Sequence, residues 1–404
     1  YHSHELDFAT STGSESAIWM STSSLEFFSV QYSTTTSDVT VFYGSTSPVS
    51  GTMAVTSSTT FNSDSTFNAL ETPYDLSITG NETHIWVSYA IGELDFFATT
   101  TPLIRVRRLD RSTLGTVDIF DVNVVHGGIG DIFVNSTNWY LPYIDVNNSN
   151  SIAVVKATTT ATTAGEVTVI GGVLNTEPYN GVHNAYDAVN DNIFIVAEHL
   201  GNVNVTGSSH GLLGTGIGVN TALDTNIFAG NTVTKIDVAG NITGNDFSYA
   251  TGLNIAGDLM LWRGIGSAWG ATNLAAPVDN TAGTINNVDQ LEIITGEDGV
   301  TNEVYVVTAK GNEIYANRIV NDTTVHPSPA FVNATSSEVA SPAAGLAVSA
   351  FRNDQQVFAD GAVLNESIKD VMYIQWYDGN SCRVDFTNID PTANNGGFSG
   401  KVSP

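Results

Sequence analysis

The sequence predicts an all-β protein built from one repeated sheet unit. Seven strand-like segments with a central aromatic or apolar residue recur along the 404 residues, about 59 residues apart on average. Glycine, serine, threonine and asparagine are abundant, and no long stretch has the apolar spacing of a helix. Units of about four strands that fill a whole chain are typical of a closed ring of sheets. We therefore expect a seven-bladed β-propeller; eight blades, or six blades plus a small N-terminal β-domain, are the alternatives.

The predicted propeller occupies residues 1–391, and a polar tail follows over residues 392–404. The positions taken as equivalent in the seven units are Trp19, Trp86, Tyr140, Phe194, Leu261, Tyr305 and Tyr373. The expected blade boundaries fall at roughly 1–70, 71–125, 126–173, 174–246, 247–286, 287–335 and 336–391.

The first unit has four candidate strands and a Ser/Thr-rich stretch, Ser45–Thr66, where an additional element would lie. The candidates are Glu5–Ala9, Ala17–Ser21, Leu25–Tyr32 and Val39–Tyr43. The last unit lacks an outermost strand, and His4–Ala9 is also suited to supply it from the opposite end of the chain. The sequence leaves both places for this segment open.

The second and third units show the clearest strand pattern. In the second unit, the third strand is either Leu94–Ala98 or Leu103–Leu109; the others are Asp75–Thr79, Ile85–Ala90 and Thr116–Val122. The third unit has strands at Asp131–Val134, Trp139–Tyr143, Ile152–Lys156 and Glu166–Ile170. Later strands are predicted at Glu303–Thr308, Glu313–Ile319, Gly345–Phe351, Val371–Trp376 and Arg383–Asn388.

The segment Leu109–Val117 places a polar turn ending in glycine between two alternating strands, which indicates a hairpin. Ile236–Ile242 repeats this order of residues, and the stretch from Asn180 to Val196 has a related pattern. These segments resemble the outer hairpins of NHL-type and surface-layer propellers. The resemblance implies the fold and does not imply an activity.

Charge and cysteine content narrow the classes of partner and location. The net charge is −28, which repels nucleic acid and anionic lipid head groups. The single cysteine, Cys382, cannot form an internal disulfide, and no run of about 18 apolar residues could span a membrane as a helix. The first residue is Tyr1, as expected of a mature chain cut from a longer precursor. We expect an extracellular or cell-surface protein with no membrane span.

Asn-x-Ser/Thr sequences permit glycosylation at eight positions, a number close to the chance expectation for this composition. The asparagines are Asn81, Asn135, Asn147, Asn204, Asn241, Asn321, Asn333 and Asn365.

Aspartates occur at or near the start of successive predicted inner strands: Asp7, Asp75, Asp131, Asp187 and Asp289. Inner strands of a propeller line its axial channel, so these carboxylates would surround the channel mouth, and Ca²⁺ prefers clustered oxygen ligands. We therefore regard Asp75, Asp131, Asp187 and Asp289 as candidate metal ligands. The alternative is that each aspartate caps a turn.

Two of these aspartates follow histidine-bearing loops at matching positions of adjacent units. His126 precedes Asp131, and His183 precedes Asp187. Facing one another near the channel, the four residues would form a metal or general acid–base site. Packing or hydrogen-bonding roles in turns are the alternative.

Two apolar segments are candidates for contacts between chains, or for packing over the face of the propeller. The residues concerned are Trp269, Leu212, Leu213 and Ile217. Nucleophile elbows, phosphate-binding loops, zinc spacings and sialidase-type aspartate boxes do not occur in the sequence. The leading hypothesis is therefore a non-catalytic surface or matrix protein that self-associates, or binds other surface proteins or glycans, as a repeating subunit of a layer or filament. The alternative is a secreted lactonase- or glycan-active hydrolase with a metal-assisted site at the channel mouth.

Overall fold

The computed structural model describes strands and turns in segments distributed from residue 4 to residue 389. The described residues are 4–7, 16–21, 26–33, 38–46, 53–62, 74–91, 102–174, 181–187, 192–199, 202–207, 225–226, 233–240, 247–265, 274–277, 279–280, 283–284, 287–297, 302–310, 313–320, 324–325, 330–334, 344–352, 370–377 and 382–389.

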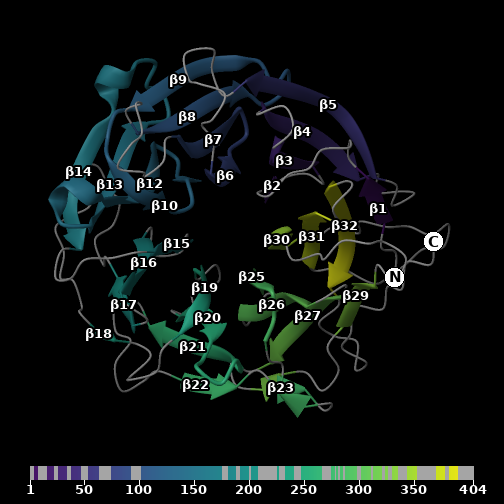
Figure 1. Ribbon diagram of the computed structural model, residues 1–404. Helices are drawn as coiled ribbons and strands as arrows, with labels where there is room; N and C mark the ends of the chain where they lie inside the picture. The colour runs from purple at the N-terminus through teal and green to yellow at the C-terminus, as the bar shows by residue number, and fades with distance from the viewer. Residues whose placement is uncertain are drawn as a thin grey trace.

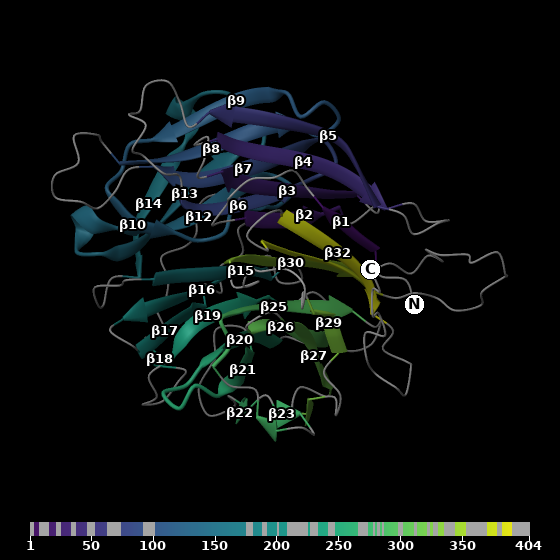
Figure 2. The ribbon, with the colours of Figure 1, turned by 45° about the vertical axis from the view of Figure 1, so that its right-hand side comes forward.

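The described residues form a ring of antiparallel sheets around one axis (Figure 1), which is the architecture of a β-propeller. Within the part of the chain that the structure describes, seven sheets have four or five strands each. Each sheet begins with a strand at the channel and runs outward, and the sheets follow one another in chain order (Figures 1 and 2). A separate two-stranded hairpin, β23 (Asp279–Asn280) with β24 (Gly283–Thr284), lies between the fifth and sixth sheets in the sequence.

The first three sheets consist of long, well-paired strands. The first contains β2 (Ser16–Met20), β3 (Glu26–Ser33), β4 (Asp38–Thr46) and β5 (Met53–Asn62). The second contains β6 (Tyr74–Gly80), β7 (His84–Ile91), β8 (Leu103–Asp110) and β9 (Thr116–Val122). The third contains β10 (His126–Ile129), β11 (Phe133–Val134), β12 (Asn138–Asp145), β13 (Ser151–Thr158) and β14 (Thr168–Leu174), with two short 3₁₀ turns at Val146–Asn148 and Ala164–Glu166.

The remaining sheets repeat the same order. The fourth contains β15 (Gly181–Asp187), β16 (Asn192–His199), β17 (Asn202–Gly207) and β18 (Thr225–Asn226), and the fifth β19 (Thr234–Ala239), β20 (Phe247–Leu253), β21 (Leu259–Ile265) and β22 (Leu274–Pro277). The sixth contains β25 (Gln290–Glu297), β26 (Asn302–Lys310), β27 (Glu313–Val320), β28 (Thr324–Val325) and β29 (Ala330–Ala334), and the seventh β30 (Ala344–Arg352), β31 (Asp370–Tyr377), β32 (Cys382–Ile389) and β1 (His4–Asp7).

The N-terminal segment closes the ring. β1 pairs antiparallel with β32, with Leu6 opposite Val384 and Asp7 opposite Arg383, and so forms the outer strand of the last sheet. This settles the place that the sequence left open for His4–Ala9. The Ser/Thr-rich stretch after residue 45 supplies β5, the outermost strand of the first sheet, and Leu103–Asp110 is the third strand of the second sheet.

Two of the seven positions that the sequence indicates as equivalent lie on strands that are not equivalent in the sheets. Trp19 lies on β2, the innermost strand of its sheet, and Leu261 lies on β21, the third strand of its sheet. The other five positions lie on second strands. In the first and fifth sheets the second strands are β3, with buried Phe28, and β20, with buried Tyr249. Likewise Ile236 lies on the innermost strand β19, so the second hairpin-like pattern is not an outer hairpin.

Apolar side chains from facing sheets interleave to form the core. Trp86, Phe120 and Trp139 belong to one buried cluster between the second and third sheets. Phe28, Ile85 and Tyr89 belong to another, between the first and second. Strands buried on both faces explain why β7 and β12 are apolar almost throughout instead of alternating. Among the described residues, no helix is long and apolar enough to cross a membrane.

Candidate carboxyl site in the axial channel

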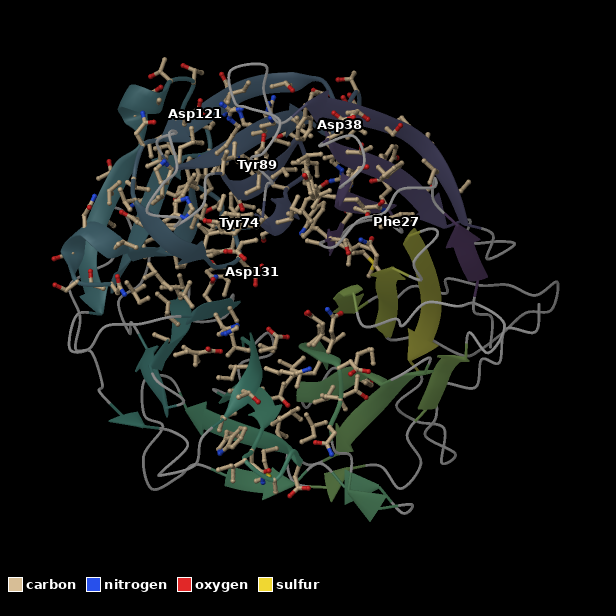
Figure 3. The ribbon with its side chains drawn as sticks, viewed as in Figure 1. Phe27, Asp38, Tyr74, Tyr89, Asp121 and Asp131 are labelled. Atoms are coloured by element: carbon tan, nitrogen blue, oxygen red, sulfur yellow. The ribbon has the colours of Figure 1, made fainter. Side chains whose placement is uncertain are left out.

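The inner strands of the first six sheets line a cavity of about 640 Å³ on the propeller axis. Most of the residues in its wall come from β2, β6, β10, β15, β19 and β25. The ionisable side chains in this wall are Asp75, Asp131, His183, Glu198, Asp237 and Glu292. Figure 3 shows Asp131 at the inner rim of the ring. The wall of this cavity therefore carries five carboxyl groups and one imidazole.

A β-bulge recurs near the start of several inner strands. The pairing of β6 with β7 shifts register between Tyr74 and Ser77, and the pairing of β19 with β20 shifts between Thr234 and Asp237. The residue after the first paired position has a left-handed backbone in both, with φ of 53° at Asp75 and 54° at Lys235. A bulge re-aims the side chains beside it. It therefore directs polar side chains of these strands toward the neighbouring sheet.

These redirected side chains bind the backbone of the next sheet along the ring. The N–H of Ile129 donates to Asp75 Oδ2 at 3.0 Å, and the N–H of Ile293 donates to Asp237 Oδ2 at 2.6 Å. Between the third and fourth sheets, the N–H of Asp131 donates to Asn184 Oδ1 at 2.7 Å, and Asn184 Nδ2 donates to the Asp131 carbonyl at 2.9 Å. The inner ring is thus held together by side-chain bonds between blades, and two carboxylates of the channel wall take part.

Asp237 and Glu292 form a pair of interacting carboxyl groups in the channel wall. Burial raises the pKa of Asp237 to about 6, against the backbone N–H bonds from Ile293 and Val238, which favour its ionised form. Burial, followed by the charges of Asp237 and Asp131, raises the pKa of Glu292 well above its ordinary value. The raised pKa of Glu292 favours a proton on this carboxyl group, and its side chain hydrogen-bonds with Asp237.

His183 and Glu198 form the second pair of the channel. His183 Nε2 lies 3.0 Å from Glu198 Oε1, and both side chains are partly buried. Burial alone lowers the pKa of His183, but the Glu198 carboxylate, with Asp237 and Asp131 beyond it, outweighs burial, and the net pKa is raised. The imidazole therefore carries positive charge at pH values where an isolated histidine would be neutral.

The two remaining carboxyl groups are also shifted toward their neutral forms. Burial raises the pKa of Asp75, and the charge of Asp131 adds to this effect. The Asp131 side chain is exposed to the channel. Loss of hydration next to the surrounding protein raises its pKa, and this effect exceeds that of the hydrogen bond from Ser77, which lowers the pKa. Carboxyl groups with raised pKa values keep their protons to higher pH than isolated carboxyl groups do. Such a wall can bind cationic or hydroxyl-rich ligands and can donate protons to them.

The structure brings three of the predicted site residues, Asp75, Asp131 and His183, to the channel wall. Asp187 lies four residues beyond His183 at the far end of β15, about 13 Å along the strand. Asp289 precedes β25, and its N–H donates to the Ala309 carbonyl. Asp7, on the closing strand β1, is on the outside of the last sheet.

His126 does not join His183 at the channel. Its ring is buried against Tyr74, with Tyr74 Oη and His126 Nδ1 3.2 Å apart, and it is not part of the cavity wall. Burial lowers its pKa, which favours the neutral imidazole. The packing role considered as the alternative fits this position. In the part of the chain that the structure describes, no group of three or more His, Cys, Asp or Glu side chains has the geometry to hold a metal ion.

Sequence reasoning missed Asp237, Glu292 and Glu198. The alignment of inner strands could have indicated Asp237. Asp237 is the first residue paired after the bulge of β19, and Ser77 is the first residue paired after the bulge of β6. Glu198 is paired opposite Gly181 across β15 and β16. A side chain on a second strand reaches the channel here because Gly181 has none.

Several predicted residues fall outside the described residues. These are the four candidate contact residues, Trp269, Leu212, Leu213 and Ile217, and the glycosylation candidates Asn241, Asn321 and Asn365. Asn81 and Asn135 have a clear local role: each side-chain oxygen accepts backbone N–H groups two and three residues ahead, which caps the tight turn before β7 or β12. Asn147 lies in a 3₁₀ turn, and Asn204 and Asn333 lie on β17 and β29.

The chain is a β-propeller, and comparisons with known proteins give it no closer assignment. No family model matches the sequence, and no curated protein matches it significantly. Among solved structures, AofleA of Arthrobotrys oligospora has 10% identity over 82% of this chain and 89% of its own, with a TM-score of 0.49. The β-propeller domain of Cps50 (Swd1) of Myceliophthora thermophila has 8% identity over 96% of this chain and all of its own, with a TM-score of 0.47. A sialidase of Trypanosoma rangeli has 9% identity over 94% of this chain and 55% of its own, with a TM-score of 0.43.

Proposed function

We propose that the protein is an extracellular surface or matrix component that associates with further copies of itself. The observation that carries this proposal is the character of its outer wall. Four of the five exposed large apolar side chains among the described residues lie on outermost strands: Val55 on β5, Val117 and Ile119 on β9, and Val169 on β14. Three consecutive blades therefore present apolar side chains along their outer edges.

The charge of this wall supports the same proposal. The acidic side chains of β9 are neutralised by the strand beneath it, because Arg105 binds Asp121 and Arg108 binds Asp118. β5 and β14 carry no charged residue. In a chain with a net charge of −28, a wall that is locally neutral and partly apolar is where a second acidic copy can approach with the least repulsion.

Sedimentation of the purified protein across a range of concentrations and salt, with electron microscopy of the same samples, tests the proposal. We expect particles larger than one chain, and we expect added salt to favour them because it screens the repulsion between acidic copies. A protein that sediments as a single chain at every concentration and ionic strength would contradict the proposal.

The Asp237–Glu292 pair favours a second candidate function, hydrolysis of a hydroxyl-rich substrate bound in the channel. A carboxyl group whose pKa is raised well above its ordinary value, next to a second carboxyl group, is an arrangement suited to general acid catalysis. Turnover of chromogenic glycosides and lactones by the wild type, abolished in Glu292→Gln, would support this function. Equal rates for the two proteins would exclude a catalytic role for Glu292.

A further inference from the structure

The outermost strand of the first sheet is an open edge of unusual length and composition. β5 runs for ten residues, and no strand pairs with its outer side among the described residues. It contains no proline, and residues 39–63 contain no charged side chain. Edge strands are normally protected from pairing with another chain by lysine, proline, bulges or short length. The pairing of β5 with β4 shifts register once, near Gly44, and is regular from Ser57 to Asn62.

The blade beneath β5 already holds this edge in place. Phe61 stacks on Tyr89 of the second sheet with ring centroids 6.4 Å apart, and the Arg107 guanidinium lies 4.4 Å from the centre of the Phe61 ring. Thr60 and Thr40 are joined across the strand pair by hydroxyl groups 3.0 Å apart. Thr56, Ser58 and Thr60 remain exposed on the other face. A strand fixed on one face loses little further conformational freedom when its edge is paired.

The charge distribution identifies the partner that suits this edge. A basic partner would gain no electrostatic attraction from β5, because residues 39–63, which include β5, contain no carboxylate. A second copy of this chain carries the same large negative charge, and it can approach closely only where charge is absent from both surfaces. Two β5 edges meet this condition at once.

We propose that β5 of one copy pairs antiparallel with β5 of a second copy, about a two-fold axis near Ser57 and Ser58, to form an eight-stranded sheet across the two molecules. The contact rests on the proposed self-association and identifies its first step. A two-fold contact closes on itself and gives a dimer, so growth into a layer or filament uses a further surface of the dimer.

A charge-complementation experiment tests the contact. Two double variants place charge on the exposed face of β5: Thr56→Glu with Ser58→Glu, and Thr56→Lys with Ser58→Lys. Like charges would then face each other across the two-fold axis, and opposite charges would face each other when the two variants are mixed. We expect each variant alone to raise the dissociation constant of the dimer at least tenfold in sedimentation equilibrium, and the equimolar mixture to restore most of the affinity.

The matched control adds the same charge away from the outer strands, as Ile255→Glu with Ala256→Glu in the exposed turn between β20 and β21. It should dimerise like the wild type, and thermal unfolding followed by circular dichroism should show all variants folded. Unchanged association of the β5 variants, or failure of the mixture to recover, would overturn the β5 pairing while leaving self-association intact. A wild type that stays a single chain would overturn the proposed function itself.

Discussion

The interaction between the Asp237 and Glu292 carboxyl groups makes a testable difference at the level of single residues. A carboxyl group whose pKa is higher in the folded than in the unfolded state stabilises the fold fully only below its unfolded pKa. That contribution is lost as the pH rises through the folded pKa. Glu292→Gln removes this loss, so its free energy of unfolding should exceed that of the wild type by on the order of 1 kcal/mol at pH 8 and match it near pH 4. Denaturant unfolding at both pH values measures the difference.

The partner substitution provides the control for this prediction. Asp237→Asn keeps an oxygen acceptor for the Ile293 N–H and should show the same dependence on pH. Because both substitutions remove one interaction, the double variant should gain less than the sum of the two single variants. If the stability gain of the double variant equals the sum of the gains of the two single variants, the two carboxyl groups do not interact.

Residue types and their order in the sequence were enough to place some of these groups and not others. Asp75 and Asp131 were predicted near the channel because both precede inner strands, and both line it. Asp187 has the same local pattern but is the last residue of β15, because the sequence does not show where an inner strand begins relative to the channel. The position of Glu198 depends on its pairing with Gly181, a contact between strands that no single-strand pattern contains.

At the level of strands and sheets, Asp75 joins the second blade to the third. Its left-handed backbone suits aspartate and asparagine and disfavours alanine. Asp75→Ala removes the acceptor of the Ile129 N–H and should destabilise the protein by about 2–3 kcal/mol. Asp75→Asn keeps that acceptor and removes a carboxyl group whose pKa is raised, so it should be neutral or stabilising at pH 7. Thermal melts of the two variants check this, and equal losses would contradict it.

Arg111 plays the corresponding role on the outer side, between the first and second blades. Its guanidinium binds Glu26, donates to Ser21 Oγ at 2.8 Å, and donates to the Asn81 carbonyl at 3.1 Å. Arg111→Met leaves a partly buried Glu26 without its cation and should cost about 3 kcal/mol. Arg111→Lys keeps the charge but loses the fork that reaches both blades, so it should cost roughly half as much. Equal stability of wild type and Arg111→Met in urea unfolding would show that the two blades do not depend on this residue.

Strand boundaries in the second blade were predicted closely because its hairpins have strong turn signals. The Asp110 side chain accepts hydrogen bonds from Ser112 and Thr113 in the turn between β8 and β9, which lowers its pKa to about 2. Equivalence between blades was harder to predict, because β2 and β3 are both aromatic and both packed into the core. Composition does not distinguish an innermost strand from a second strand when both are buried; only the pairing order does.

At the level of the whole molecule, the four residues of β1 decide whether the ring is closed. Deletion of residues 1–7 exposes the outer edge of β32 and removes the bonds that join the two ends of the propeller. We expect the melting temperature to fall by several degrees and the unfolding transition to broaden, because the last sheet then unfolds before the rest. Deletion of residues 392–404, at the opposite end of the chain, is the control and should leave the melt unchanged.

A peptide of residues 1–9 tests whether the loss comes from the missing strand itself. Added to the truncated protein, the peptide can pair with the vacant edge of β32 as an additional strand. By mass action, the melting temperature should then rise as the peptide concentration increases. A peptide in which Leu6, the residue opposite Val384, is replaced by proline cannot donate its backbone N–H there and should restore less. If neither peptide raises the melting temperature although the truncation lowers it, the N-terminal segment stabilises the ring by some means other than pairing with β32.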